Sequence, residues 1–158
     1  MLLETSQRLQ KAKNREEIVA QGAGQIIKLL DRTVIVYPVK DGKLGEPIVF
    51  PKTGDQRDFS PYMTDYEREV ALWVCKNSHH AGATTNTYSE AKSLYFAVRS
   101  ENAVFAVIAI VLDAETPPDT FDLNLLIAML GEYALALEKE QLMETKNSIA
   151  FQAHQEQL

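Results

Sequence analysis

Apolar residues in the N-terminal part of the chain recur at helical spacing. They line one side of residues 2–12, which predicts a short amphipathic helix there. Asn14 is suited to cap a second helix, which ends near Leu30. Gly22 and Gly24 weaken the middle of that helix. Glycines at such positions predict close packing against a neighbouring element.

After this helix the pattern changes to that of extended chain. Residues 34–37 and 47–50 predict two strands on either side of a DGK turn at 41–43. The proline that opens the second strand places it at an edge of the sheet, because proline has no N–H to donate. Residues 94–98 and 104–112 predict two more strands, which a tight SEN turn joins.

Two further helices complete the pattern. Thr64 or Asp65 caps a helix that runs to about Asn77, and a final helix runs from about Phe121 toward the C-terminus. Hairpins at both ends of the sheet, with the helices segregated from it, indicate the α+β class. We therefore expect a central antiparallel sheet flanked by helices, with long helices at both ends of the chain.

Composition and charge narrow the class of protein. The chain has 158 residues, of which 46% are hydrophobic and 24% charged, as expected for one globular domain. A net charge of −6 without a basic tract argues against a nucleic-acid partner. The polar N-terminus lacks the apolar core of a signal peptide, and the apolar run 103–112 is too short to span a bilayer. A single cysteine fits a reducing, cytoplasmic setting.

Cys75, His79 and His80 raise the question of metal binding or thiol catalysis. If the preceding helix reached His79, the thiol and this imidazole would share a face, but a zinc site needs three or four ligands. The apolar stretch around Cys75 should raise the pKa of its thiol, which disfavours a reactive thiolate. We expect no metal, no cofactor and no catalytic residue in this chain.

The polar loop that follows the two histidines is the candidate binding site. Threonine, asparagine and glycine in a loop that crosses an apolar sheet can close a pocket over a small molecule. Equally, such a loop can be a surface connection whose short side chains bond its own backbone, and the residues leave both readings open. The candidate pocket residues are Trp73, Asn77, His79, Gly82, Thr84, Thr85, Thr87 and Tyr95.

The final helix is longer than one domain of this size requires. Its first part is apolar around much of its circumference, but beyond Glu138 the apolar residues thin out. Leu135, Leu142 and Ile149 are seven residues apart, as in a coiled-coil seam. We expect residues 1–138 to form the domain and 139–158 to continue as a linker helix.

The segment between Trp73 and Tyr95 resembles a known family. Its pattern, W-x3-N-x3-AG-x-x-T-x-T-x-x-x-A-x-x-L-Y, is similar to the GAF segment of KdpD-type sensor histidine kinases, and the last helix is similar to the GAF exit helix. His79 and His80 stand where that family has a proline and a glycine-rich entry, so a ligand preference does not carry over. The matching positions are Trp73, Asn77, Ala81, Gly82, Thr85, Thr87, Ala91, Leu94 and Tyr95.

The resemblance implies a cytoplasmic GAF sensory domain that senses an unknown small ligand or ion. It implies a homodimer through the terminal helices, a membrane-anchored parent protein with downstream kinase domains, and regulation of potassium transport. The chain carries no H-E/D-x-R-T-P phosphoacceptor motif and no asparagine or glycine box for ATP, so we expect no kinase activity from it alone.

Two alternatives stay open. The domain could be a spacer that has lost its ligand, its pocket filled by Trp73, Tyr88, Tyr95 and Phe105. It could also be a free-standing GAF methionine sulfoxide reductase, but that chemistry uses an attacking and a resolving thiol, and the chain has one cysteine.

Overall fold

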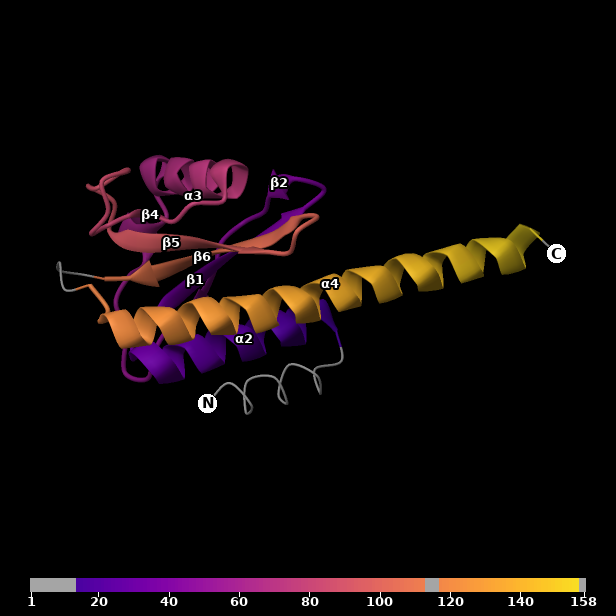
Figure 1. The fold of residues 1–158 in the computed structure, drawn as a ribbon, viewed down its shortest axis with the longest axis horizontal. Coiled ribbons are helices and arrows are strands. Elements are labelled where there is room, and N and C mark those ends of the chain that lie inside the picture. The colour runs from indigo at the N-terminus through magenta and orange to yellow at the C-terminus, as the bar shows by residue number, and fades with distance from the viewer. Residues whose placement is uncertain (1–13, 113–116, 157–158) are drawn as a thin grey trace.

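The computed structural model describes residues 14–112 and 117–156, with side chains up to residue 146 (Figure 1). The helix predicted at 2–12 lies outside these residues. The elements in chain order are α2 (Arg15–Leu30), β1 (Val34–Lys40), β2 (Lys43–Leu44), β3 (Ile48–Phe50), the 3-10 turn η1 (Ser60–Tyr62), α3 (Asp65–Asn77), β4 (Ala81–Gly82), β5 (Ser93–Arg99), β6 (Val104–Val111) and α4 (Thr120–Glu156).

The described strands form a six-stranded antiparallel sheet in the order β2-β1-β6-β5-β4, with β3 also paired to β1. This confirms the predicted α+β class with a central antiparallel sheet. The four predicted strands are present, although β1 continues to Lys40 and β3 begins at Ile48. The two-residue strands β2 and β4 and the turn η1 were not predicted, because segments this short have no periodicity of their own.

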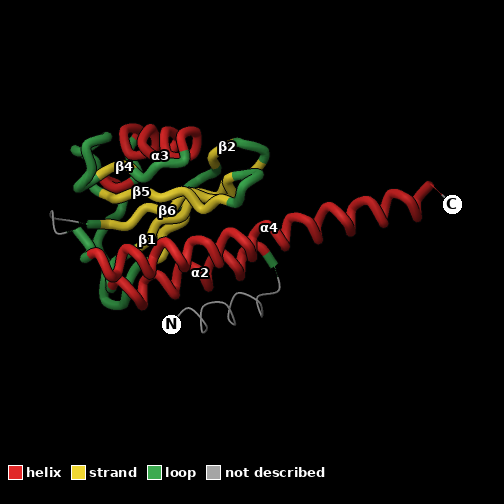
Figure 2. The backbone as a smooth tube through the Cα atoms, in the orientation of Figure 1, coloured by secondary structure: helices red, strands yellow, loops and turns green. Residues whose placement is uncertain are grey.

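Helices cover both faces of the sheet (Figure 2). α2 and α4 lie side by side on one face, and α3 lies on the other. Along β5 the side chains alternate between two hydrophobic clusters: Leu94, Phe96 and Val98 point toward α2 and α4, whereas Tyr95 and Ala97 point toward α3. The sheet therefore separates two hydrophobic cores, and each core packs against different helices.

α2 and α4 meet at a close contact around Gly22. A Cβ at this position would overlap the ring of Tyr133, so only glycine fits there. The Tyr133 hydroxyl then donates a hydrogen bond of 2.7 Å to the backbone oxygen of Val19. The predicted close packing is right at Gly22 and wrong at Gly24, where an added Cβ would meet no atom within 4 Å.

Side chains cap the N-terminal ends of the helices, with Asn14 and Thr64 in this role as predicted. Asn14, Thr64 and Asp119 each accept a hydrogen bond from the backbone N–H three residues ahead, at 2.8, 3.3 and 2.8 Å. At the other end of α3, Ser78 adopts a left-handed conformation with φ of 59°, and its N–H bonds the oxygen of Val74. The chain therefore leaves the helix before the two histidines.

α4 is a single helix of 37 residues, or about 55 Å. It packs on the domain and then extends beyond it (Figure 1). Residues Thr120–Lys146 are long and apolar enough to cross a membrane by length and composition. Leu126, Met129 and Tyr133 are nonetheless buried in the core against the sheet, so packing accounts for part of this apolar character.

Candidate functional site

A carboxylate lies buried between α3 and the sheet. Glu67 is only 2% exposed. It accepts hydrogen bonds from the Tyr95 hydroxyl at 2.7 Å and from the Lys92 backbone N–H at 3.1 Å. Burial raises the pKa of Glu67 despite these two donors, and burial also raises the pKa of Tyr95. This is a polar centre inside an otherwise apolar layer.

Two hydroxyls near this centre have no ordinary partner among the described residues. Tyr37 Oη and the Ser93 side chain are buried without a hydrogen bond. The Tyr37 and Tyr95 rings lie 6.4 Å apart, close enough for the Tyr95 hydroxyl to influence the pKa of Tyr37, but without a bond of ordinary geometry. Buried polar atoms usually have a hydrogen-bond partner, so the Tyr37 and Ser93 hydroxyls are candidate groups for bonding a small polar ligand.

The loop between β4 and β5 bonds mostly to itself. Gly82, with φ of 107°, donates its N–H to the Thr87 oxygen at 2.8 Å. The Thr85 hydroxyl lies 2.8 Å from the backbone oxygens of both Gly82 and Thr87, and it accepts the Thr87 N–H at 3.2 Å. A Cβ at Gly82 would overlap the backbone oxygen of Ser93, which fixes the loop against β5.

Aromatic rings form the rim of the site. Trp73, which is half-buried, contacts Tyr88 edge-on with ring centroids 6.3 Å apart. Tyr66 also contacts Tyr88, with ring centroids 5.9 Å apart. These ring contacts join α3 to the loop.

The structure brings together five of the predicted pocket residues and separates the rest. Trp73, Gly82, Thr85, Thr87 and Tyr95 lie around the α3 face of β5. Three others lie elsewhere: the Asn77 amide bonds the Trp73 backbone oxygen at 2.9 Å on the surface, Thr84 is exposed, and His79 lines a different groove. Whether these residues bind a ligand stays a prediction.

One sequence expectation needs correction, and three residues of the site were missed. Phe105 does not fill the α3 face, because it packs in the opposite core with Phe96. Glu67, Tyr37 and Ser93 were not identified as site residues. A charged residue at the buried position of an amphipathic helix, three before Val70, is the signal that could have found Glu67.

Cys75 and the two histidines do not share a site. Cys75 is half-buried beside the α3 core, and burial raises the pKa of its thiol, as predicted. His79 and His80 follow the helix end at Ser78. In the part of the chain that the structure describes, no three potential metal-ligating side chains of the His, Cys, Asp or Glu type come together.

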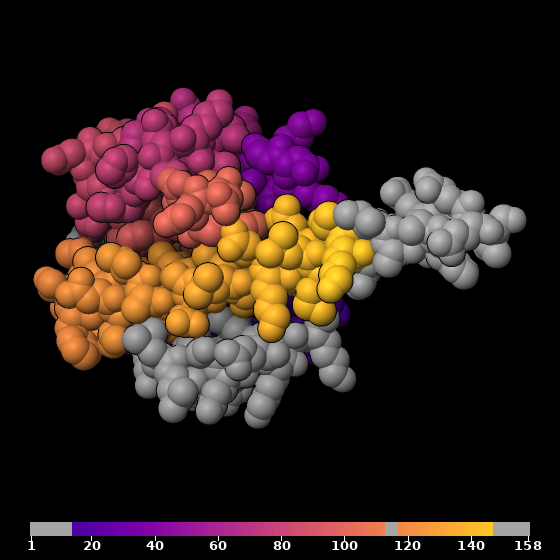
Figure 3. Space-filling view, turned by 45° about the vertical axis from the view of Figure 1, so that its right-hand side comes forward, coloured from indigo at the N-terminus to yellow at the C-terminus, as the bar shows by residue number. Residues whose placement is uncertain are grey.

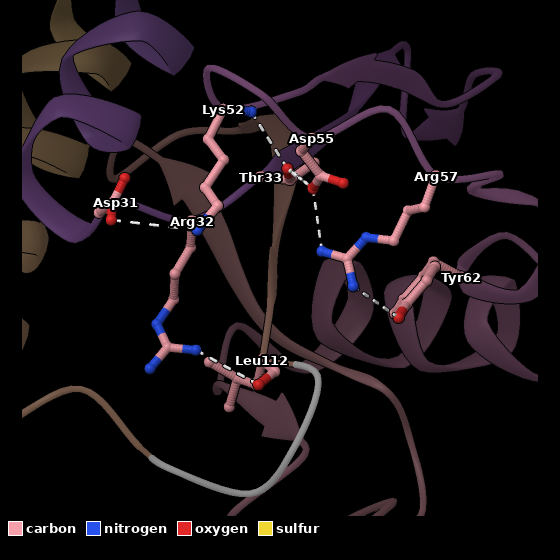
Figure 4. Close-up of polar contacts among 8 residues, drawn as sticks. All are labelled: Asp31, Arg32, Thr33, Lys52, Asp55, Arg57, Tyr62 and Leu112. Carbon is pink, nitrogen blue, oxygen red and sulfur yellow. Dashed lines mark hydrogen bonds and ion pairs between the residues drawn. The ribbon is translucent and has the colours of Figure 1, made fainter.

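Charged residues gather around a hollow of about 310 Å³ at the end of the sheet where β1 begins and β6 ends. Figure 4 shows the polar contacts among the residues there. Asp55 accepts hydrogen bonds from the Thr33 hydroxyl and from Arg57, the latter at 2.9 Å, while Arg32 bonds the Leu112 oxygen at 3.3 Å. Burial opposes ionisation of Asp55, but the bonds from Arg57 and Thr33 outweigh it and lower the pKa. The network anchors the segment after β3 to the start of β1.

Solved structures share this architecture. The GAF domain of the potassium sensor histidine kinase KdpD from Escherichia coli superposes with a TM-score of 0.66 at 20% identity, covering 92% of this chain and 96% of that one. The chain has the GAF fold. The GAF domain of an Acinetobacter phosphoenolpyruvate-protein phosphotransferase matches with a TM-score of 0.65 at 8% identity, over 89% of this chain and 92% of that one.

Sequence comparison agrees with the GAF assignment. The chain is 27% identical over 154 residues to the sensor protein KdpD of Clostridium acetobutylicum. That match covers 97% of this chain but 17% of the relative, so the GAF chain spans a small part of the protein it resembles. No protein-family model matches the chain. The resemblance to KdpD-type sensors predicted from the sequence is confirmed.

Proposed function

We propose that this GAF domain is the cytoplasmic input module of a KdpD-type sensor histidine kinase. In this proposal it dimerises, senses a small ligand or ion, and relays the signal to a downstream kinase that controls potassium transport. The similarity to a KdpD sensor protein over 97% of the chain supports the proposal. The domain contributes the sensing step and the parent protein contributes the phosphotransfer.

The observation that carries the proposal is the exit of α4 from the domain. The helix begins in the core, where Leu126, Met129 and Leu137 are buried, and continues without interruption to Glu156. A rigid element with one end inside a sensor and the other outside can transmit a shift in packing. Ligand or ionic conditions would bias the domain between two packings of the helices on the sheet.

Exposed apolar residues on α4 supply the dimer contact. Leu135 and Leu142 are 60% and 65% exposed and lie seven residues apart, and Met143 is 50% exposed. The third predicted seam residue, Ile149, has a side chain outside the described residues. Leucines at heptad spacing pair well with the same stripe of a second copy, because each buries apolar surface that water otherwise covers.

Substitution of Leu142 tests this proposal. We expect Leu142→Glu to convert the purified 158-residue domain from dimer to monomer in sedimentation velocity, with little change in its melting temperature. Gln141→Glu is the matched control, because it adds the same charge at the exposed neighbouring position. In the full-length kinase, Leu142→Glu should also lower autophosphorylation. A monomeric parent domain, or a Leu142→Glu variant that still dimerises, would contradict the dimer.

The candidate signal site is the polar centre under α3. Glu67, Tyr95 and the Tyr37 and Ser93 hydroxyls, which have no ordinary partner among the described residues, offer hydrogen bonds to a small polar ligand. We expect Glu67→Gln to change the response of the kinase to its stimulus while the dimer is retained.

A spacer without a ligand is the second candidate function. The internal bonds of Thr85 and the filling of the α3 face by Tyr37 and Tyr95 favour it. For a spacer, Glu67→Gln would leave the stimulus response of the kinase unchanged, whereas Leu142→Glu would still abolish it. The raised pKa of the lone thiol, Cys75, counts against the methionine sulfoxide reductase alternative.

A further inference from the structure

A groove of about 300 Å³ lies between α4 and the C-terminal end of α3. Figure 3 shows α4, in orange, running below the magenta atoms of α3 and the segment after it, with the β5–β6 turn between them. The groove is separate from the polar centre around Glu67, which lies on the other face of the sheet.

The groove has a cationic and hydrogen-bonding side. His79 and His80 reach it from the connection after α3, and Arg99 reaches it from the end of β5. No Asp or Glu is among the described residues that line it, although the chain as a whole carries a charge of −6. Arg99 also borders a second hollow that Glu101 and Glu138 line, but on the side of the groove its positive charge meets no carboxylate among the described residues, which favours an anionic ligand there.

Arg99 has donors to spare for such a ligand. Its Nε donates to the Ser100 backbone oxygen at 3.3 Å. Among the residues that the structure describes, none accepts a hydrogen bond from its two terminal nitrogens, and the side chain is exposed. A guanidinium presents parallel N–H groups that match the two oxygens of a carboxylate.

The opposite side of the groove is apolar and open. Ile127, which is 58% exposed, and Leu130 contribute aliphatic surface from α4. The ring of His80 stacks on Phe96, with centroids 5.7 Å apart and planes 22° apart. Gly131 leaves room beside these groups, because a Cβ there would meet no atom within 4 Å.

We propose that this groove binds a small aromatic carboxylate. The carboxylate would pair with Arg99, the two histidines would add hydrogen bonds, and the ring would lie over Ile127 and the space at Gly131. A volume of about 300 Å³ is at the lower end of small-molecule sites, which suits a one- or two-ring ligand. The proposal does not depend on dimerisation or on the kinase role.

Indole-3-acetate is a suitable probe, and its neutral analogue indole-3-acetamide tests the charge. We expect titration of the ¹⁵N-labelled 158-residue domain with indole-3-acetate to shift amide signals at 78–80, 96–99 and 127–131. Indole-3-acetamide should bind at least about tenfold more weakly, which corresponds to a loss of about 1.4 kcal/mol of binding free energy. Equal binding of the two compounds would overturn the assignment to an anion.

Two variants locate the site. Gly131→Leu fills the groove where space is available, and Arg99→Gln removes the cation, so each should weaken indole-3-acetate by about tenfold or more. Gly24→Leu is the control for the first, because that exposed glycine also has open space around it but lies on α2, away from the groove. Amide shifts that cluster elsewhere, no shifts at all, or unchanged affinity in Gly131→Leu would refute the site. A monomeric domain that binds the probe would reject the dimer and leave this site standing.

Discussion

The cores on the two faces of the sheet differ in their polar groups. On the face covered by α2 and α4, the core is formed by aliphatic and aromatic side chains, and its tyrosine, Tyr133, has a hydrogen-bonded hydroxyl. On the face covered by α3, a buried carboxylate and two tyrosines occupy the centre, and Tyr37 has no ordinary partner. Among the described residues, the buried hydroxyls without an ordinary hydrogen-bond partner, Tyr37 and Ser93, both lie on the α3 side.

The difference indicates where stability comes from and where change is possible. Burying apolar area stabilises a fold without directional requirements, whereas a buried polar group costs free energy unless all its partners are in place. The α2/α4 face therefore acts as the rigid base from which α4 emerges. The α3 face holds Glu67, whose protonation would alter the bonding there, and in the proposed function a ligand would act at the same groups.

Gly22→Ala should have the largest effect on stability, because it disrupts the close contact between α2 and α4. The new Cβ would overlap the Tyr133 ring and displace its hydroxyl from Val19. Overpacking of this kind costs about 3 kcal/mol of unfolding free energy, measured by urea denaturation.

Gly24→Ala is the control in the same helix, where an added methyl group meets open space. It should stabilise the domain by about 0.5–1 kcal/mol, because alanine is the better helix former. If the two variants were equally stable, the described contact between α2 and α4 would be wrong.

Glu67→Leu tests the polar face and should have the next largest effect. It leaves the buried Tyr95 hydroxyl and the part-buried Lys92 N–H without this acceptor, which costs about 2 kcal/mol of unfolding free energy. An unchanged urea midpoint would mean that the carboxylate does not hold α3 to β5.

Glu67→Gln tests the charge of the same residue. Burial raises the pKa of Glu67 above its ordinary value of 4.5, so the folded state binds its proton more tightly than the unfolded state does. This contribution to stability is full below about pH 4.5 and is lost as pH rises through the folded-state pKa. The free energy of unfolding of the parent domain minus that of Glu67→Gln should therefore fall from pH 4.5 toward neutrality, and a rise would reverse the assignment. The lowered pKa of Asp55 acts in the opposite direction in both proteins and cancels in the difference.

A matched pair of Tyr→Phe substitutions should show the smallest effect and the sharpest contrast. Tyr133→Phe removes a hydroxyl that bonds Val19, and should cost about 1 kcal/mol. Tyr37→Phe removes a buried hydroxyl without an ordinary partner, and should leave thermal stability unchanged or slightly higher. If Tyr37→Phe were as destabilising as Tyr133→Phe, the hydroxyl would have a bound water or ligand in solution.

Local signals explain which parts of the fold could be predicted from the sequence. Asn14 and Thr64 cap helices through hydrogen bonds to residues three positions away, so the neighbouring residues in the sequence are sufficient to identify these caps. The long strands have their own apolar pattern. β4 exists only because Ala81 and Gly82 pair with a strand that follows a dozen residues later, and no local pattern announces it.

The candidate site was less accessible because its groups converge from distant segments. Glu67 becomes a site residue through Tyr95 and Lys92, which lie 28 and 25 residues away. Phe105 was named as a residue that could fill the pocket of a spacer, but the register shifts between Val98 and Arg99, and this irregularity puts Phe105 and Ala106 in the same core, on the other face of the sheet. A one-residue slip of this kind reverses every inference from alternation.

The uninterrupted length of α4 also determines how far its end moves when its base tilts. From Glu138 to Glu156 the helix continues for roughly 27 Å at 1.5 Å per residue. A tilt of about 5° at its base would then displace the far end by about 2 Å, which is the size of shift that regulates contacts between helices. In the proposed relay, this part of α4 would act as a lever, so that a side-chain-sized rearrangement on the sheet would be amplified at the end of the helix.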